Sequence, residues 1–123
     1  MMLKLVFCLR RLPHLSSEEF QGYWRNNHAQ LVRQHAATLG MLRYVQSHAL
    51  VGGISESIRQ SRGAPEPYDG IAEAWFESEE ALKRRWADPA MAVAAQALME
   101  DERKFIDQAR SPVWYCREHN ILD

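Results

Sequence analysis

The sequence predicts an α+β protein in which helices cover one face of a four-stranded antiparallel sheet. Segments in which apolar residues occupy every second position predict strands, and segments with apolar residues three or four apart predict helices. These segments follow one another in the order β-α-β-β-α-β. A chain of 123 residues is typical of one domain with a substantial core. We therefore expect a single domain over residues 1–123.

The first predicted strand, residues 3–10, is followed by a helix with clear start and stop signals. The strand sequence LKLVFCLR carries leucine or phenylalanine at every second position. Ser16 and Glu19 have the spacing of a capping box, which predicts a helix beginning directly after Ser16. Gly40 is expected to end this helix, because glycine adopts the left-handed conformation that closes a last turn.

The predicted first helix has an unusual inner face. Five residues follow at steps of four, four, three and four and therefore share one face: Phe20, Trp24, His28, Leu31 and His35. A simple core-facing stripe would consist of aliphatic side chains. The mixed stretch YWRNNHAQLV, residues 23–32, therefore predicts either a polar core or a helix that lines a site.

The rest of the chain alternates in the same way. Strands are predicted within residues 42–51, 68–78 and 111–119, with a long polar loop over residues 52–68. Ser78 is expected to cap the second helical region, and the Asp88-Pro89 pair to break it or to start a further helix over the helix-forming residues 90–108.

This order predicts a split βαβ, the ferredoxin-like arrangement, with the helices on one face of the sheet. Several strands carry apolar residues on both faces, so the second face also needs a cover. A second copy of the chain is the simplest one.

Composition excludes several classes of protein. The net charge of −1 provides no basic field for nucleic acid or anionic lipid, and the apolar N-terminal segment is too short to span a membrane. Cys8 and Cys116 form no metal-binding spacing with histidine. We therefore expect a cytoplasmic protein with free thiols, no metal, and neither nucleic-acid nor membrane partners.

The run F-x-x-Y-W-x-x-x-H, formed by Phe20, Tyr23, Trp24 and His28, resembles that of EthD-type proteins in the dimeric α/β-barrel superfamily. The resemblance implies a homodimer whose two sheets pack face to face, with a cavity between sheet and helices in each subunit. It implies relatives such as lactone methylisomerases, polyketide cyclases, dehydratases and decarboxylases, most of which need no cofactor. Other branches are monooxygenases or haem-degrading enzymes, so the fold alone does not name the reaction.

His28 and His48 are the candidate catalytic residues. His28 matches the histidine that lines the pocket in the resembling family, although a buried, hydrogen-bonded core histidine is the alternative. His48 shares a predicted strand face with Tyr44, so both could line one cavity without touching. If this face meets the helices, His48 could reach His28 across the pocket.

The candidate substrate-binding residues are Trp24, Tyr44, Glu73 and Trp75. Glu73 and Trp75 share one face of the third predicted strand. Glu73 could orient His48 as a general base, or it could form a structural ion pair. Trp24 is expected to wall the pocket one turn before His28.

We therefore expect a cofactor-free enzyme that acts on a small cyclic or aromatic acid, lactone or polyketide. Its reaction would be a histidine-mediated proton transfer that leads to isomerisation, cyclisation, dehydration or decarboxylation. One alternative is a homodimer of the same fold that binds a small ligand, or only assembles, without catalysis. Another is a haem- or oxygen-dependent monooxygenase.

Overall fold

A computed structural model describes residues 2–123. Its strands and helices follow one another as β1 (Leu3–Leu9), α1 (Ser17–Tyr23), a π-helical turn (Trp24–His28), α2 (Ala29–Leu39), β2 (Arg43–His48), α3 (Gly53–Arg62), β3 (Gly70–Phe76), α4 (Glu79–Arg85), α5 (Pro89–Glu102), a short 3₁₀ turn (Gln108–Arg110) and β4 (Val113–Cys116).

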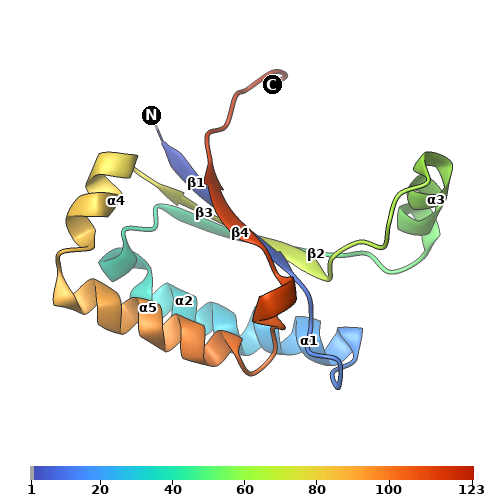
Figure 1. The fold of residues 1–123 in the computed structure, drawn as a ribbon, viewed down its shortest axis with the longest axis horizontal. Coiled ribbons are helices and arrows are strands. Elements are labelled where there is room, and N and C mark those ends of the chain that lie inside the picture. Colours follow the sequence, from blue (N-terminus) through green and yellow to red (C-terminus); the bar gives the residue numbers. More distant parts are fainter. Residues whose placement is uncertain (1) are drawn as a thin grey trace.

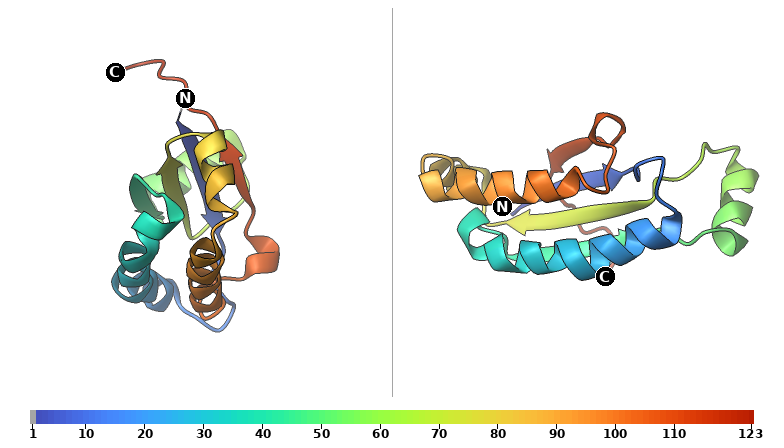
Figure 2. Two further views of the ribbon diagram at one scale, coloured as in Figure 1. Left: turned by 90° about the vertical axis from the view of Figure 1, so that its left-hand side faces the viewer. Right: turned by 90° about the horizontal axis from the view of Figure 1, so that it is seen from below.

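The four strands form one antiparallel sheet in the order β2-β3-β1-β4. The helices α1, α2, α4 and α5 lie on one face of this sheet, with α2 and α5 side by side (Figures 1 and 2). The predicted α+β, ferredoxin-like arrangement is therefore confirmed. Within residues 2–123, no helix lies on the other face of the sheet (Figure 1).

The predicted helix boundaries rest on local hydrogen bonds. The Ser16 hydroxyl accepts a hydrogen bond from the Glu19 backbone N–H, and the Glu19 carboxylate accepts one from the Ser16 N–H. Gly40 ends α2 with a left-handed φ of 79°. Ser78 and Asp88 cap α4 and α5 in the same way as Ser16 caps α1, with side-chain oxygens that accept backbone N–H groups.

The first helix is interrupted by the π-helical turn at Trp24–His28. The N–H of Ala29 donates to the carbonyl of Trp24, five residues earlier. This wider turn keeps Phe20, Trp24 and His28 aligned at steps of four, and all three are buried. It also shifts the inner face of α2, so that Val32 is buried in place of the predicted Leu31, which is only partly buried.

Two clusters of buried residues fill the space between sheet and helices. The larger one joins β1, β3 and the helices α2, α4 and α5, and its buried members include Leu3, Val32, Phe76, Leu82 and Leu98. The smaller one surrounds the π-helical turn and contains Leu9, Phe20, Trp24, Phe105 and Ile106. His28 is as deeply buried as these residues, at 3% exposure.

The predicted loop over residues 52–68 is partly wrong, because it contains helix α3 over Gly53–Arg62. Gly63 ends the helix with a left-handed φ of 59°, and Arg59 pairs with Glu56 one turn earlier. None of its residues is buried, and it stands apart from the sheet and the other helices (Figure 1). Sequence periodicity missed it because α3 has no core-facing stripe.

No helix within residues 2–123 is long and apolar enough to cross a membrane.

Candidate active site

His28 lies at the end of the π-helical turn and forms a hydrogen-bonded chain with α5. Its Nδ1 is 2.7 Å from Oδ2 of Asp101, and the hydroxyl of Tyr23 donates to Oδ1 of the same carboxylate at 2.6 Å. A neutral imidazole that donates Nδ1–H to Asp101 keeps the lone pair on Nε2. Asp101 therefore orients His28 so that Nε2 is the basic nitrogen.

Burial and hydrogen bonding determine the protonation states of Tyr23, Asp101 and His28. Burial lowers the pKa of His28, although Asp101 opposes the shift. Burial alone would raise the pKa of Asp101, but the hydrogen bonds from Tyr23 and His28 outweigh it and lower that pKa. Burial and Asp101 together raise the pKa of Tyr23 to about 12. Near neutral pH this gives a neutral imidazole, a carboxylate and a neutral phenol.

Glu102, the last residue of α5, lies on the other side of the imidazole. Its Oε2 is 3.8 Å from Nε2 of His28. Burial and the neighbouring charge of Asp101 raise the pKa of Glu102 to about 7. At neutral pH this carboxyl group therefore exists in both the acid and the carboxylate form, and it can donate or accept a proton.

Tyr44 completes the polar lining of a small cavity between β1, β2, β3 and the helices. The cavity has a volume of about 50 Å³, and His28, Tyr44 and Glu102 are among its lining residues. The Tyr44 hydroxyl oxygen accepts a hydrogen bond from Nε2 of Gln46 at 3.2 Å, which leaves its own proton free to donate. An imidazole, a carboxyl group and a phenol thus converge on one mostly apolar cavity.

A larger apolar groove begins where Glu102 borders the small cavity. Its volume is about 680 Å³, and it runs between α5 and the sheet, lined by residues such as Phe7, Phe76, Leu98 and Tyr115. Leu5, Phe7, Met41, Leu98 and Glu102 line both spaces. The groove falls within the usual size range of small-molecule sites.

Trp24 lines the small cavity, and its predicted contact with a substrate remains a prediction. Its indole lies so close to Gly70 that a Cβ at this position would meet the ring at 2.5 Å. Glycine at the start of β3 therefore allows the indole to lie against the sheet. On its other side the indole stacks on His48, with ring centroids 4.3 Å apart.

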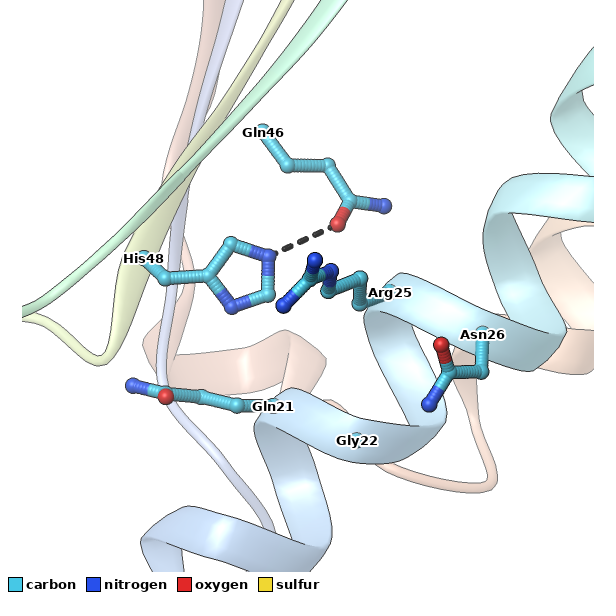
Figure 3. A pocket seen from close by; sticks show the side chains of 6 residues that line it. All are labelled: Gln21, Gly22, Arg25, Asn26, Gln46 and His48. Carbon is cyan, nitrogen blue, oxygen red and sulfur yellow. Dashed lines mark hydrogen bonds between the residues drawn. The ribbon is translucent and has the colours of Figure 1, made fainter.

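His48 lies outside the His28 cavity, so the predicted convergence of the two histidines is wrong. It lines a separate, open pocket of about 590 Å³ with Gln21, Gly22, Arg25, Asn26 and Gln46 (Figure 3). Its Nε2 is 2.8 Å from Oε1 of Gln46. The Trp24 indole, which stacks on the His48 ring and lines the cavity, lies between the two histidines.

Glu73 and Trp75 point to the helix-free face of the sheet, away from His28. Glu73 pairs with Val45 of β2 and Val6 of β1, so its side chain lies opposite to those of Ala72 and Ala74. Its carboxylate forms an ion pair with Lys4, which is the structural alternative that the sequence left open. Glu73 is nevertheless among the residues that border the small cavity.

Trp75 is covered on the same face by charged side chains. Lys4 and Arg43 lie over its ring, and its indole N–H donates to the carboxylate of Glu118. Trp75 therefore lines neither the small cavity nor the groove, and the carboxylate of Glu73 is engaged by Lys4 on the helix-free face.

Sequence reasoning missed Asp101 and Glu102, although one signal was present. Both acids end an alanine-rich helix, where the helix dipole favours cations. No basic residue lies in the last turn of α5. Acidic residues at the negative end of the helix dipole destabilise the helix, so their presence there indicates that they serve another role. Within residues 2–123 no group of three His, Cys, Asp or Glu side chains is arranged to hold a metal ion.

Comparison with known proteins identifies relatives by sequence and by fold. The model of the EthD domain matches residues 12–109. No protein of curated function matches the sequence. An EthD family protein from Bacillus halodurans C-125 superposes with a TM-score of 0.63 and 19% identity, over 97% of this chain and 100% of that chain.

Two further structures share the fold. A cofactor-independent oxygenase from Streptomyces nogalater, SnoaB, gives a TM-score of 0.56 at 16% identity, over 98% of this chain and 96% of that chain. A dimeric protein of unknown function with a ferredoxin-like fold from Bacteroides fragilis gives 0.58 at 10% identity, over 95% and 96%. These identities show a shared fold alone, whereas the family model covers most of the sequence, so the chain belongs to the EthD family.

Proposed function

We propose that the protein is a small-molecule enzyme that moves protons by means of His28 and Glu102, without needing a cofactor for this step. The observation that carries the proposal is the 3.8 Å separation of Nε2 of His28 from Oε2 of Glu102 beside an apolar groove. A base and an acid at this separation can both reach one substrate that lies beside the two groups. The pKa of about 7 for Glu102 suits a group that must exchange protons near neutral pH.

The proposed step is the removal of a proton from a carbon next to a carbonyl group. Nε2 of His28 takes the proton, the C–H electron pair forms a C=C bond, and the carbonyl oxygen becomes an enolate. Tyr44 donates its hydroxyl proton in a hydrogen bond to this oxygen, which stabilises the developing charge. Glu102 in its acid form then gives a proton to another carbon or to a leaving group, and His28 returns its proton to Glu102.

The groove indicates the class of substrate. Its lining is mostly apolar, with aromatic side chains from Phe7, Phe76 and Tyr115. A flat cyclic or aromatic ketone, lactone or polyketide would bury its rings there and present its carbonyl end to His28. Isomerisation, cyclisation and dehydration can begin with such a proton transfer. Decarboxylation begins with loss of CO₂ and ends with protonation of the same kind of enolate, so an isomerase or lyase is proposed.

The proposed active form is a homodimer. Val6, Val45, Ile71 and Trp114 lie on the helix-free face of the sheet, and Trp114 is 48% exposed. A second copy packed on this face would bury them. The dimeric, ferredoxin-like protein from Bacteroides fragilis supports this assembly.

A ligand-binding dimer without catalysis is the second candidate. The buried cavity measures only about 50 Å³, because the side chains of Trp24 and Tyr44 occupy much of the space beside His28. A cavity of this size is too small for a whole ligand. Only one end of the ligand would enter it, while the rings of the ligand would remain in the groove.

Deuterium exchange distinguishes the two candidates even while the product is unidentified. The protein is incubated in D₂O with a panel of aromatic ketones, lactones and polyketide fragments, and exchange of the carbon-bound proton beside the carbonyl is followed by NMR. We expect catalysed exchange with at least one compound, and a loss of about 100-fold or more in the His28→Gln variant. His35→Gln, a half-buried histidine of α2 outside the cavity, is the control.

Glu102→Gln should lose a similar factor, because glutamine cannot transfer a proton. If compounds bind but none exchanges faster than in buffer, the non-catalytic candidate replaces the enzyme. If His28→Gln exchanges as fast as the native protein, the proposed base is wrong.

A further inference from the structure

The open pocket that contains His48 is lined mainly by polar side chains from three elements. Gln21 and Gly22 come from α1, Arg25 and Asn26 from the π-helical turn, and Gln46 and His48 from β2. The guanidinium of Arg25 points toward the imidazole of His48 and the amide of Gln46 (Figure 3). The pocket contains one permanent cation, one group that can become a cation, and no acidic residue.

No acidic side chain within the described residues neutralises Arg25. The guanidinium takes part in none of the ion pairs or side-chain hydrogen bonds formed by residues 2–123. Asp69 is the acidic residue next to Gly70, the residue that pairs with His48 across the sheet. Its carboxylate is already bound by the side chain of Arg11 at 2.6 Å.

The hydrogen bonds of β2 determine which nitrogen of His48 is free. The amide nitrogen of Gln46 donates to the carbonyl of Trp24 and to the hydroxyl of Tyr44. The oxygen of the same amide must therefore accept from Nε2–H of His48. Nδ1 remains unprotonated in the neutral ring, and its protonation would add a second donor.

Arg25 and His48 therefore place a positive charge beside a group that can become positive, without an acidic side chain among the described pocket residues to balance them. Burial lowers the pKa of His48, and the charge of Arg25 lowers it further. An anion near both groups would pair with the guanidinium, favour the protonated imidazole and reverse the repulsion.

We propose that this pocket is a binding site for an oxyanion, either a carboxylate or a phosphate group, held by Arg25 and by His48 in its protonated form. Asn26, whose amide makes no side-chain hydrogen bond within the described residues, provides a further donor at the rim. The Trp24 indole separates the pocket from the His28 cavity. The ligand is therefore distinct from the substrate in the groove, and this proposal does not rest on the proposed reaction.

The test is an NMR titration of the full chain with inorganic phosphate and, separately, with benzoate, while the imidazole signals of all five histidines are followed. We expect saturable shifts of His48 with little change at His28, a raised pKa for His48 in the bound form, and tighter binding at pH 6 than at pH 8. Arg25→Gln should weaken binding about tenfold or more. Arg33→Gln, an exposed arginine on α2, is the matched control and should bind as the native protein does.

The two ligands distinguish the source of the anion. Saturation by benzoate alone indicates an organic acid, whereas saturation by phosphate alone indicates a phosphorylated compound or free phosphate. The proposal is overturned if neither ligand shifts His48, if Arg25→Gln and Arg33→Gln bind equally, or if the anion shifts His28 instead of His48.

Discussion

At the scale of single residues, Glu102 occupies a position that helix electrostatics disfavours. It ends α5, follows another acid, and has a side chain that is 20% exposed. Among residues 2–123, the partners of its carboxyl group are the imidazole of His28, whose pKa is lowered, and the neutral amide of Gln108, so no full positive charge offsets the burial. A buried carboxyl group that lowers the stability of the folded state is a candidate for a functional role.

Glu102→Gln should therefore stabilise the protein, with an effect that depends on pH. The folded state raises the pKa of Glu102 from 4.5 to about 7, so the folded state binds more protons than the unfolded state between these values. Stability is consequently lost as pH rises through this window, by up to about 3 kcal/mol above pH 7. Urea unfolding should show that the variant gains most at pH 8 and little at pH 5.

Glu100→Gln, on an exposed position of the same helix, controls for the loss of one negative charge. It should leave the difference in the free energy of unfolding between pH 5 and pH 8 as it is in the native protein. If both variants gain the same free energy of unfolding at pH 8, then burial of the Glu102 carboxylate does not destabilise the folded protein.

At the scale of elements, the π-helical turn determines what the first helix presents to the sheet. One extra residue in the turn keeps Trp24 and His28 aligned with Phe20, whereas the preferred face of α2 moves to Val32. The Trp24 carbonyl accepts both the Ala29 N–H and the amide of Gln46 at 3.0 Å. A side chain of β2 thus anchors the turn to the sheet. Such π-helical turns are frequent at functional sites.

Deletion of Asn26 should convert this turn into ordinary α-helix and rotate α1 relative to α2. Either Phe20 and Trp24 or His28 and Val32 would then leave the core. We expect a loss of about 3 kcal/mol or more in the free energy of unfolding, since large buried side chains are exposed. Thermal unfolding followed by circular dichroism measures this loss.

Asn26→Ala removes the same exposed side chain but keeps the length of the turn. It should change stability by less than about 0.5 kcal/mol. A deletion variant as stable as this substitution would show that the extra residue does not hold the two halves of the helix in register.

At the scale of the whole molecule, one face of the sheet has no layer of helices from residues 2–123 over it and leaves apolar side chains exposed to solvent. The helices cover one side of the sheet (Figure 2). Val6, Val45 and Trp114 lie on the other side and are partly exposed. The groove at His28 lies on the covered side. A dimer formed through the bare face would therefore stabilise the sheet without closing the groove.

Trp114→Glu should dissociate the proposed dimer, because it replaces an exposed indole that the second copy would bury on this face with a charge. Sedimentation equilibrium should give twice the subunit mass for the native protein and a lower mass for the variant. Val93→Glu is the control, since Val93 is 68% exposed on α5. A native protein that sediments as a monomer, or equal dissociation by both variants, would contradict assembly through this face.

The sequence by itself determined the four strands and the helices that cover the sheet, with most of their ends, although it did not indicate α3. Alternation predicted the four strands, and Ser16, Gly40, Ser78 and Asp88 marked the helix termini, because caps and periodicity depend on residues only a few positions apart. The stripe of Phe20, Trp24 and His28 was predicted for the same reason. The EthD-type motif lies within this locally determined part of the chain.

Only the tertiary structure decided which polar groups meet. His28 and Asp101 are 73 positions apart, and their contact depends on the packing of the first helix against α5. Alternation placed Glu73 on one face of its strand, but it could not tell which face the helices cover, because both faces are partly apolar. The raised pKa of Glu102 likewise arises from burial by distant segments, which no local pattern records.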